Sequence, residues 1–229
     1  MATTYLDLTN EVLRELNEIA LTSANFPNAV GLQQFVKDAI NKSIFDIANE
    51  EPQLPFLSAG ESGATDPFYG NVTVASVAGT RWYELKASSS SLADDYASID
   101  WDDFYLTTIN VAGETSPYVS KGLKFLNLAD WKRYYRDSEN VDDADSQAYG
   151  EPSFVIKSPD ARKFGLSPIP DKVYNLHFYA FDKPTKLVAY GDTVVFPEQY
   201  TNVITARTRY YIWQFKESPQ QAAFAMDDY

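Results

Sequence analysis

The chain of 229 residues contains no cysteine and one histidine, His177. Without cysteine there is no disulfide, no thiolate nucleophile and no cysteine-ligated metal, which suits a protein that folds in a reducing cytoplasm. One histidine excludes the usual zinc and iron sites, because those sites take two or three histidines from a single chain. A serine–histidine–acid triad would have to use His177, so few common routes to catalysis are open.

Long apolar runs, a secretion signal and nucleotide-binding loops are missing as well. No run of about 18 apolar residues occurs, so no membrane-spanning segment is predicted. The first residues lack the basic and apolar regions of a secretion signal. No Walker or dinucleotide-binding glycine loop occurs, and no cofactor is predicted. A formal net charge of −13 predicts poor DNA binding, because basic groups supply most of the non-specific affinity for phosphates.

Two stretches near the N-terminus have the spacing of amphipathic helices. Residues 4–20 repeat apolar side chains every three or four positions, and Thr4 with Asp7 fits a capping box. A second stripe of the same kind begins at Leu32, and the prolines of "EEPQLP" end it. We therefore expect two helices joined by a short loop.

The pattern of apolar and polar residues changes from about Gly60 onward. Apolar and polar residues alternate in short pieces separated by glycine, which predicts a small antiparallel sandwich or barrel. The acidic stretch Arg136–Glu151 has almost no core residues, and we interpret it as an exposed loop. The helical pattern returns at Pro197, which suits the first position of a helix, and stops at Ser218.

Together these patterns predict an α+β fold. Helices from the N-terminal and C-terminal ends form a helical bundle, with an antiparallel β domain inserted between them. The expected helical domain comprises residues 1–58 and 192–218, and the expected β-rich domain comprises residues 59–191. Residues 219–229 are expected to form a C-terminal tail.

His177 lies in the most regular strand pattern of the chain, "VYNLHFYAF". It alternates with Asn175 and Tyr179 on one face, while the opposite face of the strand is apolar. We therefore expect His177 to face solvent or a neighbouring subunit. No G-x-S-x-G serine and no bracketing metal ligands accompany it, so we interpret it as a structural histidine.

Carboxylates are the remaining catalytic option. Several aspartates crowd around Trp101 and Phe104: Asp94, Asp95, Asp100, Asp102 and Asp103. A glycoside-cleaving site needs two carboxylates at a definite separation, one of them with a pKa raised by burial. A run of neighbouring acids in a stretch rich in serine and aspartate is more typical of a solvated loop. A polysaccharide-binding or glycoside-cleaving protein therefore stays open as an alternative function.

The run "DDADSQAYGE" brings together oxygen ligands of the kind that calcium prefers. It does not match the EF-hand loop, which needs a glycine at the sixth position and a glutamate at the twelfth. Calcium binding therefore remains an open question for this stretch, and no metal site is predicted.

Basic residues gather in two places. One is Arg207 with Arg209, and the other is "WKRYYRD", which holds Lys132, Arg133 and Arg136. Arg207 follows one helical face together with tyrosines, a combination that is enriched at interface hot spots. A subunit contact and an intrachain salt bridge are both open interpretations of Arg207.

The order of these parts resembles the head-to-tail adaptor, or connector, proteins of tailed bacteriophages of the tail-tubular-protein-A type. The segments that carry the resemblance are "TTYLDLTNEVLRELNE", "GEPSFVIK", "FGLSPIPDKVYNLHFYAFDKPTKL" and "DTVVFPEQYTNVITARTRYYIWQF". Their shared marks are Gly150 and Pro152, Pro168 and Pro170, Tyr174 and Tyr179, Pro184 and Leu187, and Pro197 and Tyr200. Residues 60–140 are similar only in their general pattern of apolar and polar residues.

This resemblance implies a structural role in the virion without catalysis. Such adaptors form a closed ring of about twelve copies under the portal protein, between capsid and tail. The ring extends the channel through which viral DNA passes without specific binding, and it offers a platform for a downstream tail or nozzle protein. Another neck part, such as a tail terminator, is a related alternative. All of these would be made in the host cytoplasm.

The resemblance also suggests which residues make contacts. A terminal segment in these families often reaches the portal, and residues 219–229 are the natural candidate, although a disordered terminus is an alternative. The candidate portal or subunit contacts are Tyr200, Arg207, Tyr211, Phe224, Met226 and Tyr229.

Overall fold

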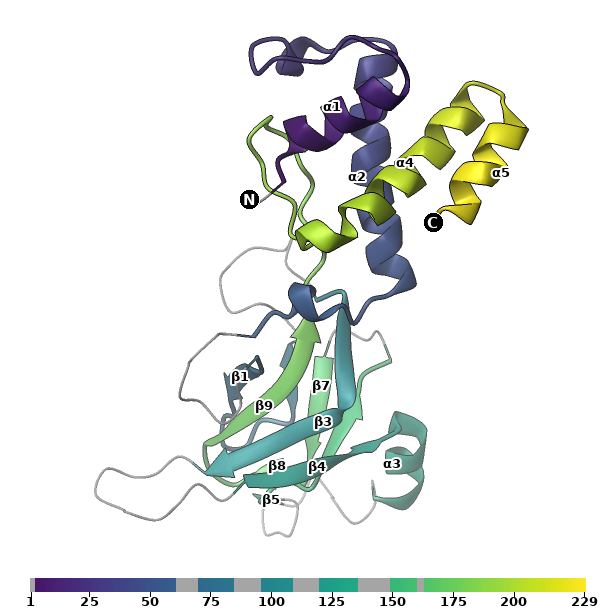
Figure 1. The fold of residues 1–229 in the computed structure, drawn as a ribbon. Coiled ribbons are helices and arrows are strands. Elements are labelled where there is room, and N and C mark those ends of the chain that lie inside the picture. Colours follow the sequence, from purple (N-terminus) through teal and green to yellow (C-terminus); the bar gives the residue numbers. More distant parts are fainter. Residues whose placement is uncertain (1–2, 61–69, 85–95, 109–119, 136–148, 160–162) are drawn as a thin grey trace. The chain divides into compact units, whose positions relative to one another are not determined.

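The computed structural model describes residues 3–60, 70–84, 96–108, 120–135, 149–159 and 163–229. The chain divides into two compact units, one formed by Met1–Leu57 with Lys183–Tyr229 and the other by Ser58–Asp182. Helices from both ends of the chain make the first unit, and the inserted segment makes a β unit (Figure 1). The α+β class predicted from sequence is confirmed. The chain returns to the helical unit at Lys183, earlier than the expected residue 192.

The helical unit packs four helices around one apolar core. These are α1 (Tyr5–Glu15), α2 (Leu32–Glu50), α4 (Thr201–Phe215) and α5 (Pro219–Asp227), with short 3₁₀ turns at Phe26–Asn28, Pro55–Leu57 and Glu198–Tyr200. The largest side chains that are fully buried in this core are Tyr5, Phe26, Leu8, Leu13 and Ile40. Figure 1 shows α4 crossing α2, with α5 folded back beside α4.

The ends of α1 follow from two local motifs. Thr4 and Asp7 form the predicted capping box, with each side chain bonded to the other residue's backbone N–H. The helix ends at Glu15 rather than near Ala20, because Asn17 adopts the left-handed conformation with φ of 57°. The backbone N–H of Glu18 then bonds to the carbonyl of Leu13 at 2.9 Å, as in a Schellman motif.

The last residues of the chain form a helix where the sequence analysis expects a tail. Pro219 occupies the first turn of α5, where its missing N–H costs nothing. Ala222 and Ala225 are buried, and α5 lies against α4. The segment thus belongs to the helical unit.

The β unit contains a seven-stranded sheet in its described residues, in the order β1-β9-β3-β4-β6-β7-β2. The strands are β1 (Val72–Ala75), β2 (Trp82–Glu84), β3 (Ser98–Thr108), β4 (Ser120–Leu126), β6 (Phe154–Lys157), β7 (Lys163–Ser167) and β9 (Tyr174–Phe181). Strands β5 (Tyr149–Gly150) and β8 (Ile169–Pro170) form a separate parallel pair, and α3 (Leu128–Tyr134) follows β4. Because β4 and β6 are parallel, the sheet is mixed, and the expectation of a purely antiparallel domain is corrected.

The core of the β unit is rich in aromatic rings. Phe104, Phe164 and Phe178 are each at most 1% exposed, and their ring centroids lie 4.8–5.8 Å apart. These pairs come from three different strands, so the rings tie the curled sheet together across its inner face.

His177 is buried, and the prediction that it faces solvent or another subunit is wrong. Its side chain is 6% exposed. The ring Nδ1 lies 3.0 Å from the hydroxyl of Thr73 on β1, and Nε2 lies 2.9 Å from the hydroxyl of Thr107 on β3. Strand β9 lies between β1 and β3, and the side chains of Thr73 and Thr107 on those strands pack against the imidazole on the face that the alternation pattern marks as polar.

Candidate interaction surfaces

Arg207 is the centre of a polar cluster that joins three helices. Its guanidinium is paired with Glu50 of α2 at 2.8 Å and donates from Nε to the hydroxyl of Tyr211 at 3.3 Å. Tyr229, just beyond α5, donates its hydroxyl to the other carboxylate oxygen of Glu50, and its ring centroid lies 4.7 Å from the Arg207 guanidinium. We call Arg207, Glu50, Tyr211 and Tyr229 the Arg207 cluster.

The phenols of this cluster are held in their neutral, donating form. Burial raises the pKa of Tyr229 to about 12, and its hydrogen bond to Glu50 acts in the same direction. Burial also raises the pKa of Tyr211, whose hydroxyl donates to Asp46. Neutral hydroxyls can donate to carboxylates throughout the physiological pH range. The Arg207 cluster is therefore an intrachain tie that fixes the end of the chain on α2 and α4.

The six predicted contact residues fall into two groups. Arg207, Tyr211 and Tyr229 belong to the cluster just described. Tyr200, Phe224 and Met226 are 38%, 68% and 41% exposed. Of the six residues, only the second group presents large apolar surface outward.

A turn that sequence reasoning missed also presents apolar side chains outward. Asn41 of α2 binds both main-chain groups of Leu187: it accepts from the N–H at 2.8 Å and donates to the carbonyl at 3.0 Å. The carboxylate of Asp192 accepts the N–H groups of Val188 and Ala189 at 2.6 and 2.7 Å. We call residues 187–192 the pinned turn. Its signal in sequence is weak, because the partner that fixes it lies 146 positions away.

The start of α1 completes the pinned turn. The N–H of Tyr5 bonds to the carbonyl of Asp192 at 2.8 Å, and that of Leu6 bonds to the carbonyl of Tyr190 at 3.1 Å. The first N–H groups of a helix have no intrahelical partner, and here the turn supplies acceptors for two of them. Val188 and Tyr190 remain exposed, at 73% and 48%.

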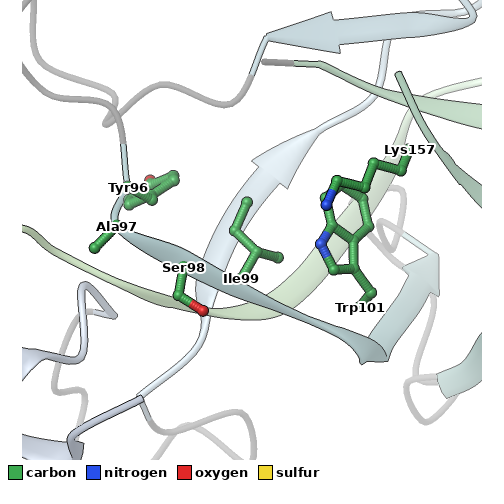
Figure 2. Close-up of a pocket in the computed structure, with 6 residues that line it drawn as sticks. All are labelled: Tyr96, Ala97, Ser98, Ile99, Trp101 and Lys157. Atoms are coloured by element: carbon green, nitrogen blue, oxygen red, sulfur yellow. The ribbon is translucent and has the colours of Figure 1, made fainter. Parts of the chain in front are cut away.

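The β unit has a pocket of about 320 Å³ at the beginning of β3. It is lined by Tyr96, Ala97, Ser98, Ile99, Trp101 and Lys157 (Figure 2). Figure 2 shows the Lys157 side chain lying over the indole of Trp101, and its Nζ is 5.4 Å from the ring centroid. The lining therefore offers aromatic surface, hydroxyl groups and one positive charge.

Asp100, Asp102 and Asp103 lie in a bulge of β3. The register of β3 against β9 shifts between Ile99 and Phe104, so the residues between them leave the regular ladder. The pKa of Asp103 is raised above its ordinary value, mainly by burial. A hydrogen bond from Tyr105 acts in the opposite direction, and the charge of Asp100 adds to the increase. Among the described residues that line the pocket there is no carboxylate. Asp100, Asp102 and Asp103 are thus not among the residues that line the pocket, and its described lining has no pair of carboxylates of the kind that cleaves sugars.

Other sequence candidates are placed as follows. Lys132 and Arg133 are exposed on α3. Asp94, Asp95, Arg136 and most of the acidic run that was considered for calcium lie outside the described residues. Where the structure describes the chain, no group of three histidine, aspartate or glutamate residues is arranged to hold a metal ion. None of its described helices has the length and apolar character needed to cross a membrane.

Comparison with known proteins gives one finding that covers both units. A family model described as SU10 adaptor protein matches residues 3–229. No curated protein matches the chain. The family match agrees with the resemblance to phage adaptors that the order of sequence elements indicates.

Proposed function

The chain belongs to the SU10 adaptor protein family, and from this premise we propose that it is a head-to-tail adaptor of a tailed bacteriophage. The observation that carries the proposal is the extent of the match, which runs through the helical unit, the inserted β unit and α5. The protein is then a structural part of the virion neck, made in the host cytoplasm and placed between portal and tail. Its work is to position other proteins rather than to transform a substrate.

The proposed assembly is a ring of about twelve copies beneath the portal. A closed ring of identical chains needs a heterologous interface, in which two different surfaces of each copy meet. Exposed aromatic and apolar side chains on the helical unit can form such contacts, among them Tyr200, Phe224 and Met226. In this arrangement Arg207, Tyr211 and Tyr229 contribute indirectly, because they hold α5 in place.

The net charge suits a channel for DNA. Each copy carries a formal charge of −13, so a ring of such chains surrounds its channel with negative charge. Duplex DNA has about one negative charge per 1.7 Å, and it is repelled by such a wall. We propose that viral DNA passes through without specific binding, while the far side of the ring receives a downstream tail or nozzle protein.

The native mass of the purified protein, measured alone and with the cognate portal ring, tests this function. We expect portal rings to acquire about twelve copies of the chain, in line with closed cyclic assembly. The matched control is a portal ring from an unrelated phage, which should acquire none. A protein that ignores its cognate portal at every concentration tested would refute the adaptor role.

A further inference from the structure

The main chain of the pinned turn is held by hydrogen bonds with two side chains. Both main-chain groups of Leu187 are bound by Asn41, and Asp192 fixes the next two N–H groups. The main chain that carries the exposed side chains of Val188 and Tyr190 is therefore fixed before any partner arrives. A surface that is already ordered loses little conformational entropy on binding, which favours its use as a contact.

Positive charge lies beside this turn. Lys183 and Lys186 are both exposed; Lys186 comes directly before the turn and Lys183 lies three residues earlier. No ion pair formed within the described part of the chain engages either of them. In a chain with a net charge of −13, a turn with exposed apolar side chains that follows two such lysines is a local exception. Its complement is an apolar surface that carries negative charge.

The outward face of α5 has that complementary character. Ala222 and Ala225 are buried toward the rest of the unit, whereas Phe224 is 68% exposed. Asp227 comes three residues after Phe224, which is the spacing of neighbours on one helical face, and it is exposed. The Arg207 cluster holds the helix end in place, so this face is also ordered in advance.

The two surfaces lie on opposite sides of the helical unit. Figure 1 shows the turn beside the start of α1 at one side of the helical unit, and α5 at the opposite side with α2 and α4 between them. They cannot meet within one chain without unfolding. A contact between two different, oppositely placed surfaces joins copies head to tail, and repeated contacts of this kind form a ring when the rotation from copy to copy closes.

We propose that the pinned turn of one copy, with Lys186, docks on the outward face of α5 of the next copy, with Phe224 and Asp227. The inference rests on the proposed function, because it names the contact that builds the proposed ring. Val188 and Tyr190 meet Phe224, while Lys186 meets Asp227 across the interface.

Charge reversal at the two positions tests this contact. Lys186→Glu places an acid opposite Asp227, and Asp227→Lys places a base opposite Lys186, so each variant alone repels its own copies. For each variant we expect the protein concentration that fills portal rings to rise at least about tenfold. This corresponds to a loss of about 1.4 kcal/mol per contact. An equal mixture of the two variants should recover wild-type filling, because each new charge then meets an opposite one. The matched control is Glu18→Lys, a reversal at another exposed position of the helical unit.

The outcomes separate this inference from the adaptor role itself. Native mass spectrometry counts the copies bound per portal ring, and circular dichroism checks that each variant is folded. Loss in the single variants with recovery in the mixture supports the contact, and Phe224→Ser should show the same loss. If the single variants fill rings as the wild type does, or if the mixture fails to recover, the contact is wrong while the adaptor role stands. If the wild type itself forms no rings on its portal, both proposals fall.

Discussion

At His177, two threonine hydroxyls take the place of water around a buried imidazole. Thr73 and Thr107 reach the two ring nitrogens from the strands on either side, at 3.0 and 2.9 Å. A buried polar group without partners would cost a few kcal/mol, and here both nitrogens have partners. The three side chains therefore link β1, β9 and β3 across the sheet, in addition to the backbone hydrogen bonds between these strands.

Replacement of this histidine is expected to destabilise the β unit. His177→Ala leaves a cavity and removes the partner of two threonine hydroxyls, so the free energy of unfolding should fall by about 2–3 kcal/mol. Urea denaturation followed by tryptophan fluorescence measures it, since Trp82, Trp101 and Trp131 lie in the β unit. Asn175→Ala on the same strand is the control. A change below about 0.5 kcal/mol, typical of an exposed side chain, would contradict the burial of His177.

Single residues mark where sequence reasoning succeeds and where it stops. The capping box of Thr4 and Asp7 was predictable, because all of its groups lie within one helical turn. The burial of His177 was not, because it depends on which strands flank β9. The role of Asn41 was hidden for the same reason, since Leu187 is remote in sequence.

At the scale of elements, α5 owes its position to polar contacts as much as to apolar ones. It is nine residues long, which is too short to be stable alone, and its buried side chains toward α4 are two alanines. Glu50 joins it to the rest of the unit by accepting from both Arg207 and Tyr229. Sequence did offer a signal for this helix in Ser218-Pro219, which marks a helix start as well as a helix end.

Removal of the Glu50 carboxylate should loosen α5 selectively. Glu50→Ala breaks the ion pair with Arg207 and the hydrogen bond from Tyr229, so α5 should open more often than the rest of the unit. We expect its amide hydrogens to exchange about tenfold faster, which corresponds to about 1.4 kcal/mol. Hydrogen–deuterium exchange with peptide resolution measures this, with Glu51→Ala, an exposed neighbour, as the control. Equal acceleration in α1 and α5 would mean that Glu50 stabilises the whole unit rather than this helix.

At the scale of the whole molecule, the chain leaves the helical unit and returns to it at adjacent points of the β unit. Ser58 and Phe181 form a β-bridge, and the N–H of Ala59 bonds to the carbonyl of Ala180 at 2.9 Å. Alternation and composition predicted an inserted β domain, because those signals are local. They did not predict the strand order or the parallel β4–β6 pair, which depend on pairing between distant segments.

This arrangement predicts that the β unit folds by itself. The segments by which the chain enters and leaves it already meet, and it has a core of its own around Phe104, Phe164 and Phe178. Domains inserted in this way have close termini and fold independently. A fragment comprising residues 58–182 should therefore unfold cooperatively in urea and retain near-ultraviolet circular dichroism from its packed aromatic rings. The control is the same fragment with Phe104→Ala, which should lose about 3–5 kcal/mol and with it the near-ultraviolet signal. If the unmodified fragment lacks a cooperative transition, the β unit needs the helical unit to fold, and the two units are then one folding domain despite their separate cores.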